Sequence, residues 1–204
     1  MKKADTAIIL AGGKSLRMGF DKKYIKVGNQ FLIDILINKL KKIFDEIIVV
    51  SNDKKVYKND GVIVVEDEIK NIGPLGGLHI GLKHSSSNYS YVIACDMPYI
   101  NEAYIEFMKT KLELKDDVYA VITRYKEHIE PFNSFYSKKM TEEIKKHICT
   151  QKRSIFSLLK KLEVIYIEEV MARYFSPDWQ MFKNLNTRKE LEKFYLKNNE
   201  GRVL

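Results

Sequence analysis

The segment 6–24 constrains the fold of this 204-residue chain more than any other part. It begins with the short apolar run 7–10, which is typical of a buried strand in an α/β sheet. The loop that follows has three glycines in eight residues, Gly12, Gly13 and Gly19, so its backbone N–H groups can approach a ligand closely. The same loop carries four cations, Lys14, Arg17, Lys22 and Lys23. A strand that leads into such a loop predicts a polyphosphate site.

Two better-known phosphate-binding loops do not match this segment. It ends like a P-loop at Gly12-Gly13-Lys14-Ser15, but the first glycine of that motif would fall on Ile8. A dinucleotide fingerprint that started at Gly12 would have Lys14 where its second glycine belongs. The loop is therefore of a different kind.

Length and composition predict one domain over residues 1–204, with a nucleotide half at about 1–100 and an acceptor half at about 101–204. Hydrophobic residues make up 45% and charged residues 30% of the chain, as in ordinary globular proteins. No stretch approaches the roughly 18 unbroken apolar residues of a membrane span. Two distant cysteines, Cys95 and Cys149, predict neither a disulfide framework nor a Cys-x-x-Cys metal pair. We therefore expect a cytoplasmic protein.

The net charge of +8 indicates acidic partners, which could be nucleic acid, an anionic membrane or a phosphorylated small molecule. The basic residues are spread in pairs such as Lys41-Lys42 and Lys145-Lys146, and no long basic tail is present. A lysine-rich surface explains this pattern better than a nucleic-acid footprint does, so neither nucleic acid nor membrane is an expected partner.

Two further strands are expected to end at the edge where the first loop lies. Helical spacing over 31–44 is followed by a strand at Glu46–Val50, which completes a strand–loop–helix–strand unit with a right-handed crossover. Asn52 follows this strand and either hydrogen-bonds a base or ribose or forms a turn. Val62–Val65 is the next strand, and Asp67 follows it, either at the ligand or as a solvated acid of an acidic turn.

The glycine-rich segment 73–78 opens the next helix. Pro74 suits an early helical position, because its φ is preset and it wastes no donor. Gly76 and Gly77 would let the helix N-terminus approach a ligand closely.

A fourth strand at 91–94 presents a carboxylate at the same edge. Pro98 forbids further ladder pairing, so Asp96 lies at the carboxyl end of the strand, across from the first loop. A carboxylate beside a triphosphate can hold Mg²⁺. The alternative for Asp96 is an N-cap or turn acid.

Elements of the second half carry less chemical information. The pattern predicts Asn101 as the N-cap of a helix to Leu112, strands at 118–122, 131–136 and 164–167, a charged turn or lid at 124–130, a helix at 155–162, and a capping box of Thr187 and Glu190 before the last helix.

Two motifs resemble the signatures of the molybdenum cofactor guanylyltransferase (MobA) family. They are Leu10-Ala11-Gly12-Gly13-x-Ser15-x-Arg17-Met18-Gly19-x-Asp21-Lys22 and Cys95-Asp96-x-Pro98. The resemblance implies an α/β, Rossmann-like three-layer sandwich with a mostly parallel sheet, as in nucleotide-diphospho-sugar transferases. It also implies transfer of GMP from GTP to Mo-molybdopterin, release of pyrophosphate, Mg²⁺ as cofactor, and other molybdenum cofactor assembly proteins as candidate partners.

The resemblance further implies roles for single residues. Arg17 and Lys22 would offset charge on the leaving pyrophosphate, and Asp96 would hold the metal and act with them in catalysis. The implied nucleotide-binding set is Leu10, Ala11, Gly12, Gly13, Lys22, Asn52, Asp67, Gly76 and Asp96.

The acceptor side is matched more weakly. Arg153 resembles a family position near the acceptor, although an arginine on a helix surface has the same pattern. Asn184 and Asn186 precede the last helix, as an Asn-x-Asn does in the family. Where the family usually has Pro-Leu, this chain has Pro131-Phe132, a departure without obvious chemical consequence.

Two alternatives to the guanylyltransferase stay open. One is a cytidylyltransferase or another enzyme that joins an NTP to a phosphate acceptor. The family's cytidylyl branch usually has Leu-Ala-Ala-Gly at this position. Gly12 in place of that alanine leaves room near the base, which favours guanine. The other is a non-catalytic GTP-binding homologue, against which Arg17, Lys22 and Asp96 argue.

Overall fold

A single mixed sheet organises the chain in the computed structural model. The structure describes residues 3–12, 14–15, 20–21, 25–52, 61–69, 72–115 and 117–199. The strands of this sheet, in spatial order, are β11 (Val164–Glu168), β9 (Ala120–Tyr125), β10 (His128–Ser137), β8 (Tyr89–Ala94), β1 (Thr6–Leu10), β6 (Glu46–Val50) and β7 (Val62–Val65). Only β10 runs antiparallel to its neighbours in this sheet. The predicted mostly parallel α/β sheet is confirmed.

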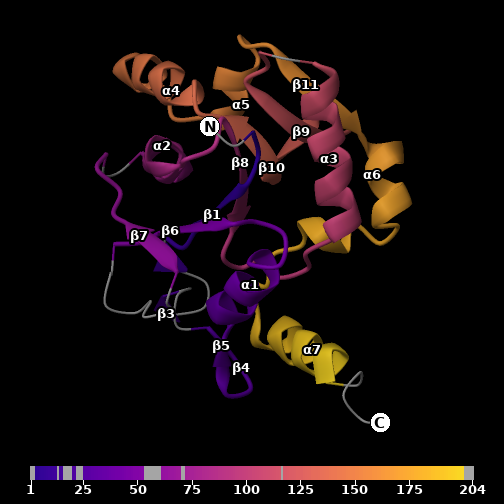
Figure 1. Ribbon diagram of the computed structural model, residues 1–204. Coiled ribbons are helices and arrows are strands. Elements are labelled where there is room, and N and C mark those ends of the chain that lie inside the picture. Colours follow the sequence, from indigo (N-terminus) through magenta and orange to yellow (C-terminus); the bar gives the residue numbers. More distant parts are fainter. Residues whose placement is uncertain are drawn as a thin grey trace.

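Helices cover both faces of the sheet, which gives three layers. One face carries α1 (Leu32–Leu40), α3 (Glu102–Leu114) and α6 (Glu169–Phe175), and the other carries α2 (Pro74–His84), α4 (Met140–Cys149) and α5 (Ile155–Leu159). Figure 1 shows α2 and α4 on one side of the strands and α3 and α6 on the other. Two separate apolar clusters fill the space between the sheet and these layers.

The first strand shows why both faces are covered. All five residues of β1 are buried, and successive side chains point to opposite faces. Ala7 and Ile9 belong to one apolar cluster, whereas Ile8 and Leu10 belong to the other. A strand that is apolar on both faces requires a helix layer on each side.

Helix α2 packs directly on the sheet because two of its glycines face β1. A Cβ built on Gly81 would lie 2.6 Å from Ile8 Cγ2, and one built on Gly77 would lie 3.2 Å from Leu10 Cδ2. Side chains at these positions would push the helix away from the strand. The glycines therefore set how near the helix N-terminus stands to the strand ends.

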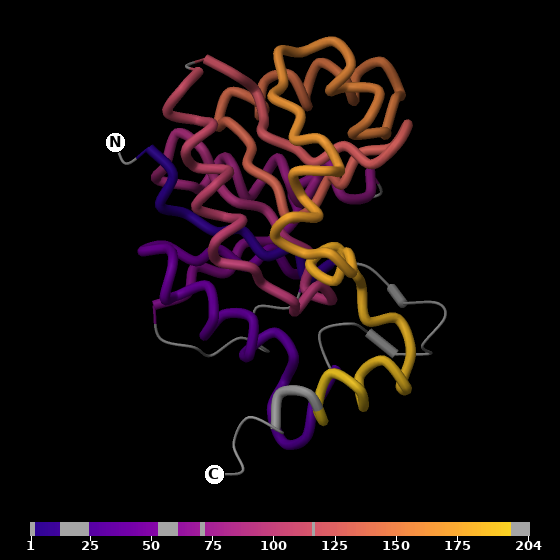
Figure 2. Tube along the Cα trace, turned by 90° about the vertical axis from the view of Figure 1, so that its right-hand side faces the viewer, coloured from indigo at the N-terminus to yellow at the C-terminus, as the bar shows by residue number. Residues whose placement is uncertain are grey.

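A small third cluster joins the C-terminal helix to the start of the chain. The hairpin of β4 (Lys26–Val27) and β5 (Gln30–Phe31) packs on α7 (Arg188–Asn199) through Val27 and Leu191. Figure 2 shows this C-terminal helix, in yellow, close to the violet part of the chain that contains the hairpin. The predicted capping box is present, since Glu190 N–H donates to Thr187 Oγ1 at 3.2 Å and Thr187 N–H donates to Glu190 Oε2 at 2.9 Å.

Strand predictions hold well near the parallel core and less well beyond it. The strands at 46–50 and 62–65 match the structure at both ends, and Asn101 Oδ1 accepts from Tyr104 N–H as the expected N-cap. The predicted helix at 155–162 is shorter, because α5 ends at Leu159. The sequence interpretation did not predict the β4–β5 hairpin at 26–31, α4, α6 or the 3₁₀ turn η2 (Gln180–Phe182).

The predicted turn or lid at 124–130 was mostly wrong. β9 continues to Tyr125 and β10 begins at His128, so only two residues form the turn. Arg124 Nε donates to Glu168 Oε1 at 3.1 Å, and its guanidinium lies over the Tyr166 ring. These cross-strand contacts hold the segment in the sheet as a hairpin.

No helix in the described part of the chain is long and apolar enough to cross a membrane.

Candidate active site

A cavity of about 400 Å³ opens at the carboxyl ends of the parallel strands. It is lined by Leu10, Gly12, Val50, Ser51, Asn52, Asp67, Gly73, Pro74, Gly77, Ala94, Cys95, Asp96, Phe132 and Asn184. Four parallel strands and the N-terminus of α2 contribute to it, which is where open α/β sheets bind their ligands. The volume lies in the range of small-molecule sites.

Backbone hydrogen bonds extend beyond the strands and bring the lining residues together. Ala11 N–H donates to Val50 O at 2.9 Å, and Ser51 N–H donates to Val65 O at 2.9 Å. Cys95 N–H donates to Leu10 O at 3.1 Å. Each bond joins the first residue after one strand to the end of its neighbour, so the loops leave the sheet at one level.

Asp96 is held at this edge by backbone contacts on both sides. Its side chain is 1% exposed, and Met97 N–H donates to Ala94 O at 3.0 Å to close the turn around it. The Asp96 carbonyl accepts from Leu185 N–H at 2.8 Å. This bond ties the segment before α7 to the carboxylate loop and places Asn184 in the cavity wall.

The carboxylate of Asp96 suits a magnesium ion that arrives with a nucleotide. Mg²⁺ is usually held by one or two carboxylates together with substrate phosphates and waters. The described residues contain no group of three His, Cys, Asp or Glu side chains able to hold a metal by themselves. Asp96, a cavity-lining carboxylate at a strand end, fits a metal that is held jointly by the protein and the substrate phosphates.

Asp67 occupies a space that only glycine leaves open. A Cβ built on Gly76 would lie 2.8 Å from Asp67 Cγ and nearer still to both carboxylate oxygens. Asp67 Oδ1 also accepts from Ile69 N–H at 3.0 Å. Burial raises the pKa of the Asp67 carboxyl, while the Ile69 hydrogen bond and the nearby His79 oppose that rise.

The entry to α2 depends on one glycine with positive φ. Gly73 has φ 65° and ψ −147°, a region that residues with a Cβ rarely adopt. Pro74 follows at the first helical position, and both residues line the cavity. The sequence interpretation placed this segment beside the ligand, and the structure places Gly73 and Pro74 beside the cavity.

His79 is a buried histidine behind the site. It is 2% exposed, and neither ring nitrogen has a hydrogen-bond partner among the described residues. Burial lowers its pKa, as do Lys145 and Lys83, whereas Glu68 and Asp67 act in the opposite direction. The neutral ring is therefore the form that the fold favours.

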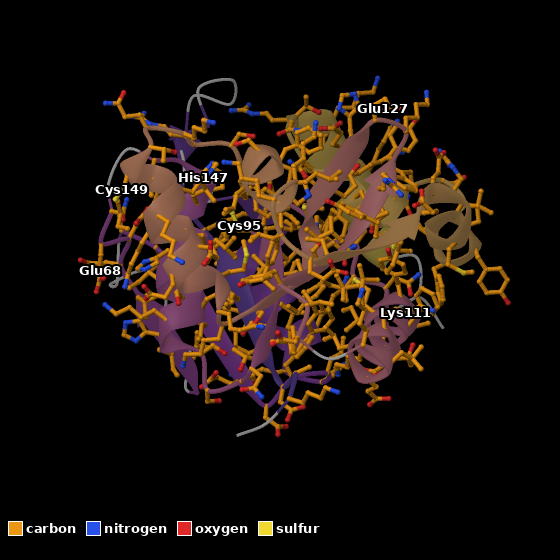
Figure 3. The ribbon with its side chains drawn as sticks, turned by 90° about the horizontal axis from the view of Figure 1, so that it is seen from above. Glu68, Cys95, Lys111, Glu127, His147 and Cys149 are labelled. Atoms are coloured by element: carbon orange, nitrogen blue, oxygen red, sulfur yellow. The ribbon has the colours of Figure 1, made fainter. Side chains whose placement is uncertain are left out.

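The two cysteines occupy different environments. Cys95 is buried, lines the cavity and lies near the centre of the molecule seen from above, whereas Cys149 lies at its periphery (Figure 3). Both are free thiols.

The cavity brings together six of the residues named from the sequence, namely Leu10, Gly12, Asn52, Asp67, Asp96 and Asn184. Gly76 does not line the cavity but lies against Asp67, and Ala11 is buried in the sheet ladder. Gly13, Arg17 and Lys22 lie outside the described residues, so their predicted roles stay predictions. Asn186 is absent from the lining set, and its backbone N–H donates to Glu190 Oε2 at 2.9 Å.

A second cavity of about 370 Å³ adjoins the first. It is lined by Pro74, His128, Ile129, Pro131, Phe132, Arg153, Ser154, Ile155 and Phe156. Pro74 and Phe132 line both cavities, so the weakly predicted Arg153 faces a space that adjoins the candidate nucleotide site. The sequence interpretation noted Phe132 only as a departure from the family's Pro-Leu and gave it no role, because no spacing rule links it to either cavity.

Comparisons with known proteins agree with this geometry. Residues 7–165 match the model of the MobA-like NTP transferase domain. A molybdenum cofactor guanylyltransferase of Syntrophotalea carbinolica is 49% identical over 94% of this chain and 91% of its own length. A probable molybdenum cofactor guanylyltransferase of Peptoclostridium acidaminophilum is 48% identical over 93% of this chain and 87% of its own length.

A solved structure supports the fold. Molybdopterin-guanine dinucleotide biosynthesis protein A from Archaeoglobus fulgidus superposes with a TM-score of 0.78 at 24% identity, covering 96% of this chain and 99% of that one.

Proposed function

Because this chain belongs to the MobA-like NTP transferase family, we propose that it is a molybdenum cofactor guanylyltransferase. It transfers GMP from GTP to the terminal phosphate of Mo-molybdopterin and releases pyrophosphate. The observation that carries the proposal is the cavity at the strand ends, which Asp96, Asp67 and the N-terminal residues of α2 line together.

The reaction exchanges one phosphoanhydride bond for another. An oxygen of the acceptor phosphate attacks the α-phosphorus of GTP, the bond between the α- and β-phosphates breaks, and pyrophosphate leaves with the electron pair. The acceptor phosphate is already an anionic nucleophile, so the protein has to position two anions and neutralise their charge rather than abstract a proton.

The nucleotide end of the cavity supplies the positioning. The open backbone at Gly12 and the amide of Asn52 line the same space as the Asp67 carboxylate. We assign these groups to the base and ribose, because a carboxylate and an amide can accept from and donate to a nucleoside but would repel or miss a phosphate chain.

The phosphate end supplies charge. Asp96 is assigned as the protein ligand of Mg²⁺, which when bound neutralises the phosphates and polarises the α-phosphate. Arg17 and Lys22 are assigned to the leaving pyrophosphate on the basis of the loop motif. Arg153, whose cavity adjoins this one, is assigned to the acceptor phosphate. Asn184, which lines the first cavity, and Asn186, two residues further along the chain, are assigned to the acceptor as well.

This function requires a cytoplasmic source of both substrates, so the predicted cytoplasmic location is part of the proposal. The proposal also includes contacts with other molybdenum cofactor assembly proteins. It gives nucleic acid no role.

Nucleotide binding tests the proposal directly. Calorimetry with GTP, CTP, ATP and UTP, with and without Mg²⁺, is expected to show a preference for GTP that is tighter with the metal. In Asp96→Ala the dependence on Mg²⁺ should disappear. Failure to bind any nucleotide would rule out the transferase, and a preference for CTP would assign the chain to the cytidylyl branch.

Gly12→Ala sharpens the base assignment. Nothing described lies within 4 Å of a Cβ built on Gly12, so the variant should keep its fold. The added methyl group should weaken GTP binding and shift preference toward CTP. Equal loss for both nucleotides would remove Gly12 from base selection.

A further inference from the structure

Phe132 is the side chain that connects the two cavities. Among the described residues only Pro74 and Phe132 line both of them. Phe132 is partly exposed and packs against both apolar clusters of the protein, one on each face of the sheet. Its ring is therefore not enclosed in either core, and part of it is available to a ligand.

An irregularity in β10 places this ring. Between Glu130 and Phe135 the chain advances five residues on β10 while β9 advances only two, from Thr123 to Val121. Bulges of this kind bend a strand and redirect side chains, often beside active sites. Phe132 lies inside the bulge, so its direction does not follow the alternation of the strand.

Side-chain hydrogen bonds hold the bulge on both sides of Phe132. Tyr136 Oη donates to Pro131 O at 2.7 Å, and Ser134 Oγ donates to Glu130 O at 2.9 Å. Such bonds remove backbone freedom before any ligand arrives, which is how binding surfaces are pre-organised.

Asn133, the residue after Phe132, is also held by side-chain hydrogen bonds. Asn133 is buried and has φ 61°, a left-handed conformation that asparagine tolerates better than most residues. Its Oδ1 accepts from Tyr91 Oη at 2.6 Å, and its Nδ2 donates to Met181 O at 3.2 Å. The amide thus ties the bulge to β8 and to η2.

The side chains that line the second cavity suit a planar anionic ligand. It combines two aromatic rings, Phe132 and Phe156, with the guanidinium of Arg153 and the imidazole of His128. Aromatic rings stack on planar heterocycles, and a guanidinium pairs with phosphate. The Phe156 ring already has Lys160 Nζ 4.3 Å from its centroid, so part of its π-face is occupied.

We propose that Phe132 determines acceptor specificity: its ring, fixed by the β10 bulge between the two cavities, stacks on the planar heterocycle of the acceptor. The inference rests on the proposed function, which supplies a pterin as the acceptor heterocycle.

Two readouts on Phe132→Leu and Phe132→Tyr test the proposal. The first is GMP transfer to Mo-molybdopterin, in which Phe132→Leu should raise the acceptor KM about tenfold, keep GTP affinity within about twofold and leave kcat nearly unchanged. Phe132→Tyr should restore the acceptor KM because it keeps the stacking face. The second readout is titration of a phosphorylated pterin into the protein without GTP, where stacking lowers the pterin absorbance.

The absorbance change separates a contact from a general packing effect. We expect it in the unsubstituted protein and in Phe132→Tyr, and expect it to vanish in Phe132→Leu. Phe107→Leu, the same substitution on α3 away from both cavities, controls for loss of packing. If the Phe132→Leu protein is less stable than this control, the comparison of Phe132→Leu with Phe132→Tyr is repeated below the melting range of both.

The outcomes distinguish this inference from the function on which it rests. If GMP transfer fails in the unsubstituted protein while the pterin absorbance change persists and depends on Phe132, the function is wrong and the aromatic contact stands. If transfer is normal and Phe132→Leu changes neither readout, the inference is overturned. Loss of the absorbance change in Phe156→Leu alone would assign the stacking to that ring and also overturn it.

Discussion

The two adjoining cavities of this protein are built in different ways. The first is made by strand ends and by glycines, so the backbone sets its shape. The second depends on a bulged strand whose side chains are tied by hydrogen bonds to distant segments. Six parallel strands share one direction, and β10, the antiparallel member, supplies the bulge.

This difference has a physical consequence. A site shaped by close backbone packing tolerates few changes at Gly76 and Gly77, because a Cβ added at either position meets a packed side chain. A site made by side chains depends on a network, so its changes spread through several residues. We therefore expect single substitutions to abolish binding at the first cavity, whereas single substitutions at the second cavity should weaken binding only partly.

The largest contrast is expected between one carboxylate and one guanidinium. Asp96→Asn should lower the rate of GMP transfer on the order of 10²- to 10³-fold, as loss of a preorganised charged group does elsewhere. Arg153→Gln should raise the acceptor KM only about tenfold, because its side chain is exposed and a single exposed ion pair contributes little. Steady-state kinetics with both substrates varied would measure the two effects. Equal losses of activity in the two variants would contradict the proposed difference between the cavities.

Gly76→Ala tests the tight packing of the first cavity. The added Cβ collides with the Asp67 carboxylate, so we expect a loss of about 1–3 kcal/mol in unfolding free energy and weaker GTP binding. Urea unfolding and calorimetry would measure the two losses.

A double-mutant cycle identifies the collision as the cause. In an Asp67→Ala background the carboxylate is gone, so Gly76→Ala should cost much less stability. Additive losses would mean that Gly76 acts through another contact.

Asn133→Ala tests the network of the second cavity. The substitution leaves the buried Tyr91 hydroxyl without its acceptor and replaces asparagine at positive φ by alanine, which tolerates that conformation less well. About 1–3 kcal/mol of unfolding free energy should therefore be lost. The acceptor KM should rise while GTP affinity stays the same. Asn133→Gly is the control, because glycine adopts this φ freely and the difference between the two variants isolates backbone strain. A selective loss of GTP affinity would contradict the division between the cavities.

The smallest effect is expected from protonation of His79. Its pKa is lowered in the folded protein, so the unfolded chain binds the proton more tightly and stability falls as the pH drops below about 6.5. Above that pH the imidazole contributes no slope. His79→Leu should flatten the stability profile between pH 7.5 and 5.5 by up to about 1 kcal/mol. Thermal melts at matched ionic strength would show this, and an unchanged slope would remove His79 as its source.

Much of the first cavity could be predicted from the sequence. Apolar runs that end in glycine, serine or a Cys-Asp-x-Pro turn mark strand ends locally, and parallel strands bring those ends to one edge. Asp96, Asn52 and Asp67 were found in this way, and all three line one cavity in the structure. The capping box of the last helix was equally local, because its two residues are three apart.

Only the tertiary structure decided how the second cavity is formed. Tyr91 and Asn133 are 42 residues apart, and Asn133 is 48 residues from Met181, so no periodicity or motif connects them. The bulge in β10 depends on those bonds, and it moves Phe132 out of the strand alternation from which its direction would be predicted. Local chemistry at strand ends thus determined the nucleotide side, whereas long-range side-chain hydrogen bonds determined the shape of the cavity beside it.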